Sequence, residues 1–270
     1  MTDVYLYIPH PDDETLSMGL AATYYLSLGL TVHFVFMSRG PVTMASTGLD
    51  GARFCNPHQY THDPANEHFA NPAMTEDDIA AVRIAEGVSA AGAMGTVNGA
   101  GPVYIHEGSL GYKFGGDDWQ NPTGVPEAQA IMAALVDAGG NSFHHTMSDT
   151  DRHPDHACLG HALRNLKNDP VYGPRLTGSR FFVSRLYWNY TKYPDVAQQA
   201  GLNWVSRSIS NGRLPEYVDV LRKRVGPVYG AWNPAGNTYA VGWHQVQNQF
   251  IQNGLMPPTS TVGIDNLWHL

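Results

Sequence analysis

The sequence predicts an α/β protein whose mostly parallel sheet is flanked by helices and decorated by long loops. The first forty residues alternate a strand-like apolar run, a turn, a segment of helical periodicity and a second strand-like run. The same alternation recurs between residues 103 and 187. Parallel strands need such crossover connections, and ligands of open parallel sheets bind beyond the carboxyl ends of the strands.

Each element has a local signal. Strands are predicted at residues 4–8, 31–37, 103–106, 142–147 and 180–187, and helices at 16–28, 76–91, 126–138, 155–166, 215–225 and 243–252. Thr75 is expected to cap the second helix, because three acidic residues follow it. Residues 38–75 are rich in Gly, Pro, Asn and His without a sustained period, which predicts a long ordered loop. We expect one domain over residues 1–270, with a motif-bearing core at about 1–190 and an idiosyncratic part at about 191–270.

Composition and charge narrow the class of partner. Hydrophobic residues make up 43% of the chain and charged residues 15%; an average domain has roughly 25% charged residues. The formal net charge is -8, without a cluster of Lys or Arg. These features argue against nucleic acid and anionic lipid as partners and favour a small molecule. They do not predict an oligomeric state.

Cellular location is predicted from the cysteines and the apolar runs. Cys55 and Cys158 lie far apart without a CxxC partner, which indicates neither a disulfide framework nor a zinc knuckle. The first residues lack the basic and apolar regions of a secretion signal. No apolar stretch approaches the roughly 18 residues of a membrane span. We therefore expect a cytoplasmic protein without stable membrane insertion.

Two short motifs carry the chemistry: His-Pro-Asp-Asp-Glu at residues 10–14 and His-Pro-Asp-His at 153–156, each just past a predicted strand. His10 and Asp13 lie three apart on a tight turn, which can aim an imidazole and a carboxylate at one point. His156 would arrive from another strand end as the third ligand. Three protein ligands with an open position for water distinguish catalytic from structural zinc.

The remaining motif residues suit proton transfer. Asp12 is the candidate general base, because an unligated carboxylate beside the metal can take a proton from the attacking water. His153 is the candidate oxyanion stabiliser and acid, and Asp155 is expected to hold the His153 ring by hydrogen bonding. Glu14 is either a supporting residue behind the ligands or simply a negative charge at a helix N-terminus.

Together the two motifs resemble the signature of the PIG-L, or LmbE-like, N-deacetylase family. The similarity runs from the first strand to about Leu166 and includes an Arg83-x-x-Glu86 helix. It implies a Rossmann-like fold, usually a zinc ion although Fe²⁺ is an alternative, and removal of acetyl from an N-acetylglucosaminyl group by hydrolysis of a linear amide. Motif by motif it implies the same ligands and roles as above. Pro9 departs from the small residue usual before the first motif.

The substrate is predicted less directly. The low charge and the aromatic stretches at 112–119 and 187–204 resemble the subgroup that deacetylates teicoplanin-type glycopeptide-antibiotic pseudoaglycones. The alternatives are another N-acetylglucosaminide, such as a thiol-sugar or inositol conjugate, and loop aromatics that only pack on the core.

Other histidines allow a rival metal site. His58, His62 and His68 could form a second cluster, but they lie in a Pro- and Asn-rich loop without helical spacing, so polar loop histidines are expected. His144 and His145 are expected to be packed or hydrogen-bonded.

Two other functions are disfavoured by the sequence. A dinucleotide-binding oxidoreductase is disfavoured because the first strand–helix turn lacks a glycine-rich phosphate loop and the Gly-Ala-Gly at 99–101 does not open a helix. A non-enzymatic carbohydrate-binding protein on the same fold is disfavoured by the intact ligands and the intact Asp12. No cofactor beyond the metal is expected.

Overall fold

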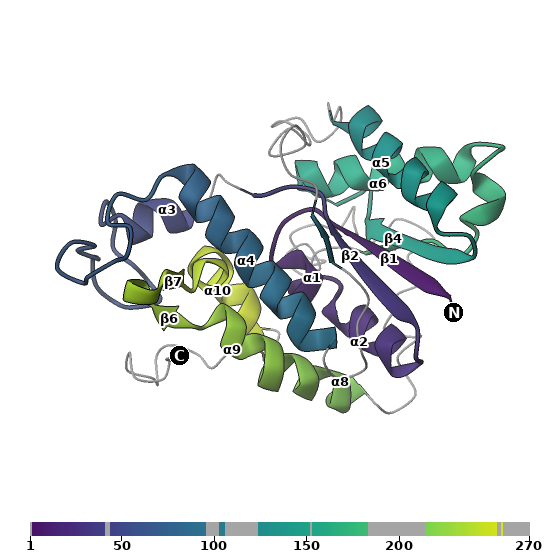
Figure 1. The fold of residues 1–270 in the computed structure, drawn as a ribbon. Coiled ribbons are helices and arrows are strands. Elements are labelled where there is room, and N and C mark those ends of the chain that lie inside the picture. Colours follow the sequence, from purple (N-terminus) through teal and green to yellow (C-terminus); the bar gives the residue numbers. More distant parts are fainter. Residues whose placement is uncertain are drawn as a thin grey trace, which may run out of the picture.

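A computed structural model describes residues 2–40, 44–95, 103–105, 124–151, 153–182, 214–252 and 255. Within these residues the central sheet has five strands, all parallel, in the order β3-β2-β1-β4-β5 (Figure 1). The strands are β1 (Asp3–Ile8), β2 (Thr31–Phe36), β3 (Val103–Ile105), β4 (Ser142–Met147) and β5 (Arg180–Phe182). The fold is Rossmann-like, and the predicted α/β class is confirmed.

Strand β1 lies in the middle of the sheet and is buried on both faces. Its side chains alternate between two separate cores: Val4, Leu6 and Ile8 pack in one, and Tyr5 and Tyr7 in the other. Alternation follows from the two-residue period of a strand. A strand covered on both faces needs a nearly continuous apolar run, as this one has.

Helices cover both faces of the sheet (Figure 1). Helices α5 (Val125–Ala138) and α6 (Pro154–Asn168) pack on the Tyr5 and Tyr7 side. The opposite face is covered by α2 (Gly19–Ser27), α4 (Glu76–Gly95) and the C-terminal helices. Smaller elements are α1 (Asp13–Leu16), α3 (Met44–Leu49) and a 3-10 turn at Gly173–Arg175.

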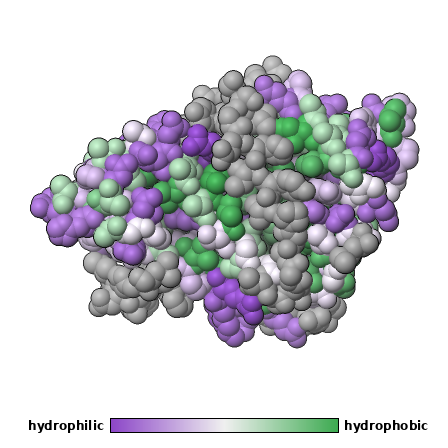
Figure 2. Space-filling model, viewed as in Figure 1, coloured by the Kyte–Doolittle hydropathy of each residue, from purple (hydrophilic) through white to green (hydrophobic). Residues whose placement is uncertain are grey.

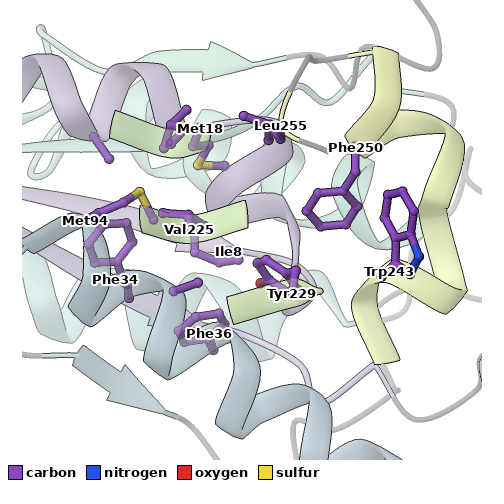
Figure 3. Packing of buried hydrophobic residues seen from close by; sticks show 14 of the residues in the cluster. Ile8, Met18, Phe34, Phe36, Met94, Val225, Tyr229, Trp243, Phe250 and Leu255 are labelled. Atoms are coloured by element: carbon purple, nitrogen blue, oxygen red, sulfur yellow. The ribbon is translucent and has the colours of Figure 1, made fainter. Parts of the chain in front are cut away.

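The C-terminal segment packs into the core beside α4. It comprises α8 (Leu214–Val220), a π-helical stretch (Leu221–Val225), α9 (Gly226–Tyr229), a hairpin of β6 (Trp232–Asn233) and β7 (Thr238–Tyr239) around a 3-10 turn (Pro234–Gly236), and α10 (Val241–Gln252). Figure 3 shows Val225 and Tyr229 of this segment next to Ile8 of β1, with Phe250 and Trp243 farther out beyond Tyr229. A core shared in this way supports the prediction of one domain, which stays a prediction.

Most predicted elements are confirmed within a few residues. The expected Thr75 cap is present: its hydroxyl accepts from the Asp78 backbone N–H at 3.2 Å, and the Asp78 carboxylate accepts from the Thr75 N–H at 2.8 Å. The helix expected at 16–28 is two helices, and α3 lies inside the expected loop at 38–75. Residues 106 and 183–187 of the predicted strands lie outside the described residues. In the described part of the chain, no helix combines the length and apolar character needed to cross a membrane.

Candidate active site

The two motifs meet at the carboxyl ends of the neighbouring strands β1 and β4, which pair in parallel. The first motif begins two residues after Ile8, and the second begins six residues after Met147 and continues into α6. Gly160 lets α6 approach the loop closely, because a Cβ there would lie 2.0 Å from the Asp149 backbone nitrogen. The strand ends therefore bring together two segments about 140 residues apart in sequence.

The three predicted metal ligands converge on one carboxylate oxygen. Oδ2 of Asp13 lies 3.3 Å from Nδ1 of His10 and 3.0 Å from Nε2 of His156. The Ser17 hydroxyl donates to the other Asp13 oxygen at 2.8 Å. Two imidazoles and a carboxylate are a donor set typical of catalytic zinc.

Each of these imidazoles faces a second carboxylate. Nε2 of His10 lies 2.7 Å from Oδ2 of Asp155, and Nδ1 of His156 lies 3.3 Å from Oδ2 of Asp151. Burial alone would lower the pKa of His156, but Asp13 and Asp151 outweigh it and raise that pKa well above the usual value. Burial is likewise outweighed at His10, whose pKa is raised by Asp13 and Asp155.

These directions indicate a site with excess negative charge that attracts a cation. The surrounding carboxylates favour a bound proton on each of the two imidazoles. Burial would raise the pKa of Asp13, but His156 and His10 hold it well below its usual value. A divalent ion would take the place of those protons, because it binds neutral imidazole and ionised carboxylate. The residues present therefore fit a divalent metal.

His153 lies against the same group, so a second donor set is possible. His10, His153 and His156 each offer a nitrogen, and these atoms lie within 4.8 Å of one another. His153 is also the N-cap of α6, where its Nδ1 accepts from the backbone N–H of Asp155 at 3.2 Å. Burial, with His10 and His156 nearby, lowers the pKa of His153 to about 2. The neutral ring then carries its proton on Nε2 and can donate there.

Asp155, which is expected to hold the His153 ring, lies beside both that ring and His10, and is nearer to His10. Its Oδ2 lies 4.0 Å from Nδ1 of His153 but 2.7 Å from Nε2 of His10. The physical reason is the helix cap, because Nδ1 of His153 is already engaged by a backbone N–H. The carboxylate therefore turns to His10, although it remains beside both rings.

Asp12 is buried and held by an arginine from α4. Nη2 of Arg83 donates to Oδ2 of Asp12 at 2.8 Å, and Nη1 donates to the carbonyl of Gly40. Burial raises the pKa of Asp12, and Arg83 opposes that rise. The φ angle of Asp12 is 143°, a conformation that costs a non-glycine residue about 1–3 kcal/mol and clusters at functional sites.

Glu14 is buried behind the first motif. Of its two interpretations, the supporting residue is therefore favoured over a simple charge at a helix N-terminus. The side chain is 0% exposed. It accepts from the Asp12 backbone N–H at 2.8 Å, from the Thr15 hydroxyl at 2.6 Å and from the Tyr229 hydroxyl at 2.5 Å. Burial raises its pKa to about 8. Glu14 thus ties the strained turn at Asp12 to the C-terminal segment.

Sequence reasoning named Arg83 and Glu86 only as a family feature and missed their contacts. Glu86 accepts from the backbone N–H groups of Val241 and Gly242, at 2.7 and 2.9 Å, and so caps the N-terminus of α10. Both residues are nearly buried on α4. Two charged residues one turn apart on the inward face of an amphipathic helix were the available signal.

The other histidines fall into two groups. His144 bonds the Tyr7 hydroxyl through Nδ1 at 2.8 Å, and His145 accepts from the Arg180 backbone N–H at 3.0 Å, so both are packed as expected. The expectation of polar loop histidines is wrong for His58 and His62, which are each 3% exposed and lie beside Cys55 and His244. It holds for the exposed His68. The aromatic stretches at 112–119 and 187–204 lie outside the described residues.

Comparison with known proteins identifies relatives of the chain. The family model described as PIG-L: GlcNAc-PI de-N-acetylase matches residues 6–167, which include both motifs. No curated protein matches. Similar solved structures include the conserved protein TT1542 from Thermus thermophilus, with 20% identity, 68% of this chain and 67% of that chain covered, and a TM-score of 0.41. The N,N'-diacetylchitobiose deacetylase from Pyrococcus horikoshii has 14% identity, coverage of 83% and 78%, and a TM-score of 0.43. A deacetylase of the teicoplanin biosynthesis pathway has 16% identity, coverage of 69% and 68%, and a TM-score of 0.45.

Proposed function

Because the chain belongs to the PIG-L, or GlcNAc-PI de-N-acetylase, family, we propose that it is a metal-dependent hydrolase that removes the N-acetyl group from an N-acetylglucosaminyl moiety of a glycoside. The observation that carries this proposal is the convergence of His10 and His156 on one oxygen of Asp13, within the residues that the family model matches.

We assign the metal to His10, Asp13 and His156, with zinc as the first candidate. A divalent ion held there would supply Lewis acidity, which would polarise the amide carbonyl and lower the pKa of water from about 16 to about 7. Asp155 and Asp151 support the outer nitrogens of the two histidines, the contact that orients ligating imidazoles in metal sites. The His10, His153 and His156 set is the alternative.

Asp12 is proposed as the general base. Its carboxylate lies beside the proposed ligands in sequence but is not needed as one, and Arg83 fixes its position. Burial raises its pKa, which brings a carboxylate closer to the operating pH and makes it a better proton acceptor. Arg83 opposes that rise and so favours the ionised carboxylate, which is the form that accepts the proton.

His153 is proposed to stabilise the oxyanion and to protonate the leaving amine. The neutral ring offers its Nε2 proton, because Nδ1 accepts a backbone hydrogen bond. Its side chain is 40% exposed, compared with 13% for His10, as expected of a group that meets the substrate. Negative charge that develops on the amide oxygen raises the pKa of a neighbouring imidazole. The exposed ring would then take up a proton from solvent and pass it to the amine nitrogen as the C–N bond breaks, while Asp12 would release the proton of the attacking water to solvent.

For the substrate, we propose a teicoplanin-type glycopeptide pseudoaglycone, in antibiotic biosynthesis, as the first molecule to test. The support is compositional: 11% of the residues are aromatic and only 15% are charged, which suits stacking on an aryl-rich aglycone. The alternative is another small N-acetylglucosaminide, such as an inositol conjugate or a thiol-sugar conjugate. The inositol conjugate fits the description of the family.

The experiment incubates metal-replete protein with a panel of N-acetylglucosaminides that includes a pseudoaglycone, an inositol conjugate and a thiol-sugar conjugate. Acetate release is followed by mass spectrometry, with chelator-treated protein as the control. We expect metal-dependent release from at least one member, and the preferred member identifies the aglycone class. Binding of these sugars without release from any of them would instead favour a carbohydrate-binding protein.

A further inference from the structure

Four side chains outside the active site lie close together, and their residue types are those of a metal site. Cys55, His58 and His62 come from the loop before α4, and His244 comes from α10. Each offers one ligand atom, and the four atoms lie within 4.8 Å of one another. The three loop residues are 2–3% exposed. Their spacing, Cys-x2-His-x3-His, is close to that of structural zinc sites.

The outer nitrogens of two of these histidines are already engaged. Nδ1 of His244 lies 2.8 Å from the carbonyl oxygen of Ala240, which can only accept, so Nδ1 carries the proton. Nε2 of His244 therefore has a lone pair, is buried, and meets no hydrogen-bond partner among the described residues. Nδ1 of His62 lies 2.9 Å from the Glu67 carboxylate. Metal-ligating histidines show this arrangement, with the outer N–H donated to a carbonyl or carboxylate.

The loop backbone holds the other two donors on one turn. The N–H of Cys55 donates to the carbonyl of Tyr60 at 2.8 Å, and the N–H of Gln59 donates to the carbonyl of Cys55 at 2.7 Å. Gln59 adopts the left-handed conformation that closes the turn, with φ of 64°. The backbone N–H of His58 bonds the Cys55 sulfur, and Nδ1 of His58 lies 3.0 Å from Nε2 of His62.

Aromatic rings cover part of the cluster, although His244 itself is only half-buried. The Trp232 ring packs edge-on against His58 with a centroid distance of 4.2 Å, and Phe69 lies beside both Trp232 and His62. The surface of the molecule around this loop and α3, at the left of Figure 2, carries hydrophilic residues among weakly hydrophobic ones. Four protein donors leave no open position, which distinguishes a structural zinc site from a catalytic one. A thiolate with imidazoles favours zinc over harder cations.

We propose that Cys55, His58, His62 and His244 bind a structural Zn²⁺ ion, separate from the metal of the active site. The ion joins the loop to α10. Because Glu86 of α4 caps the same helix, the site fixes the C-terminal segment against the motif-bearing core. The Glu67 carboxylate supports this zinc site through its contact with Nδ1 of His62. The competing account is a metal-free cluster in which His58 and His62 share a hydrogen bond.

The first test measures zinc per chain in the purified full-length protein by mass spectrometry of the metal. We expect two ions in the wild type, and a loss of one ion in Cys55→Ser and in His62→Ala. His156→Ala should lose the other ion, and Cys55→Ser with His156→Ala should lose both. His68→Ala is the matched control, because it removes an exposed histidine of the same loop, and should keep two.

The second test is X-ray absorption at the zinc edge, whose main result comes from the wild-type protein. We expect a Zn–S shell at about 2.3 Å in the wild type, and a larger sulfur share per zinc in His156→Ala. The proposed catalytic donors contain no sulfur, so this shell reports the second site alone. One zinc per chain with a sulfur shell would support the proposal, since the active-site ion can be lost during purification. Zinc with only nitrogen and oxygen neighbours, or full zinc content in Cys55→Ser, would overturn it, whatever the deacetylase activity.

Discussion

Replacing Arg83 with glutamine should move the acid limb of the pH–rate profile to higher pH. Arg83 donates to Asp12 at 2.8 Å, and the two residues are 4% and 5% exposed. Burial raises the pKa of Asp12, and the guanidinium opposes that rise. Without the guanidinium, only the weaker influence of His10 opposes burial. Asp12 is then protonated over a wider pH range and cannot accept a proton there.

The magnitude follows from the buried charge pair. Unit charges about 4 Å apart interact by about 4 kcal/mol at an effective dielectric constant of about 20, and one pKa unit corresponds to about 1.36 kcal/mol. The acid limb should therefore move up by about one to three pH units, with three as the limit for a structure that does not relax. Stability should also fall, because removal of one partner of a buried pair costs about 3–5 kcal/mol. Protonation of Asp12 reduces that loss.

The assay is kcat/KM as a function of pH, which reports the groups of the free enzyme, with a thermal melt to confirm folding. Arg83→Lys keeps the charge and should shift the limb less than Arg83→Gln. Arg175→Gln is the control, because it removes an arginine that pairs with the exposed Asp137, and should not shift the limb. A folded, active Arg83→Gln with an unchanged acid limb would refute the coupling of Arg83 to the base.

Three further predictions test the site and its support. His156→Ala removes a proposed ligand, so metal affinity and acetate release should fall by more than about tenfold; retained metal in a folded variant would exclude His156 as a ligand. Tyr229→Phe removes the donor to buried Glu14, and urea denaturation should show a free energy of unfolding lower by about 1–3 kcal/mol; an unchanged value would mean that Glu14 does not depend on it. Burial lowers the pKa of His144 from 6.5 to about 4, so the unfolded chain binds a proton that the folded chain does not. The free energy of unfolding should therefore fall as pH drops from about 6.5 to about 4, by up to about 3 kcal/mol; an equally steep curve for His144→Gln would contradict this.

The sheet and the place of the two motifs could be predicted, because both depend on local patterns. A strand such as Asp3–Ile8 shows itself as an apolar run, and the carboxyl ends of parallel strands meet at one edge. A polar motif that directly follows such a strand is therefore expected at that edge of the sheet. The convergence of His10 and His156 follows from this rule.

What the sequence did not indicate depends on contacts between distant segments. The burial of His58 comes from packing against Trp232 and His244, which lie 174 and 186 residues farther along the chain. The loop has no sequence period that indicates this packing. The motif placed Asp155 beside His153, but it did not indicate that Asp155 also lies beside His10, or that Nδ1 of His153 accepts from the backbone of α6. Residue type alone does not predict which partner each group meets.

The most direct test of the proposed reaction compares Asp12→Asn with the wild type for bound metal and for acetate release from the preferred N-acetylglucosaminide. Asparagine keeps the size of the side chain and tolerates positive φ, but it cannot take a proton. We predict unchanged metal content with acetate release lower by about 10²–10⁴-fold. Turnover equal to that of the wild type would remove Asp12 from the role of base. Loss of the metal would show that Asp12 serves metal binding instead of proton transfer.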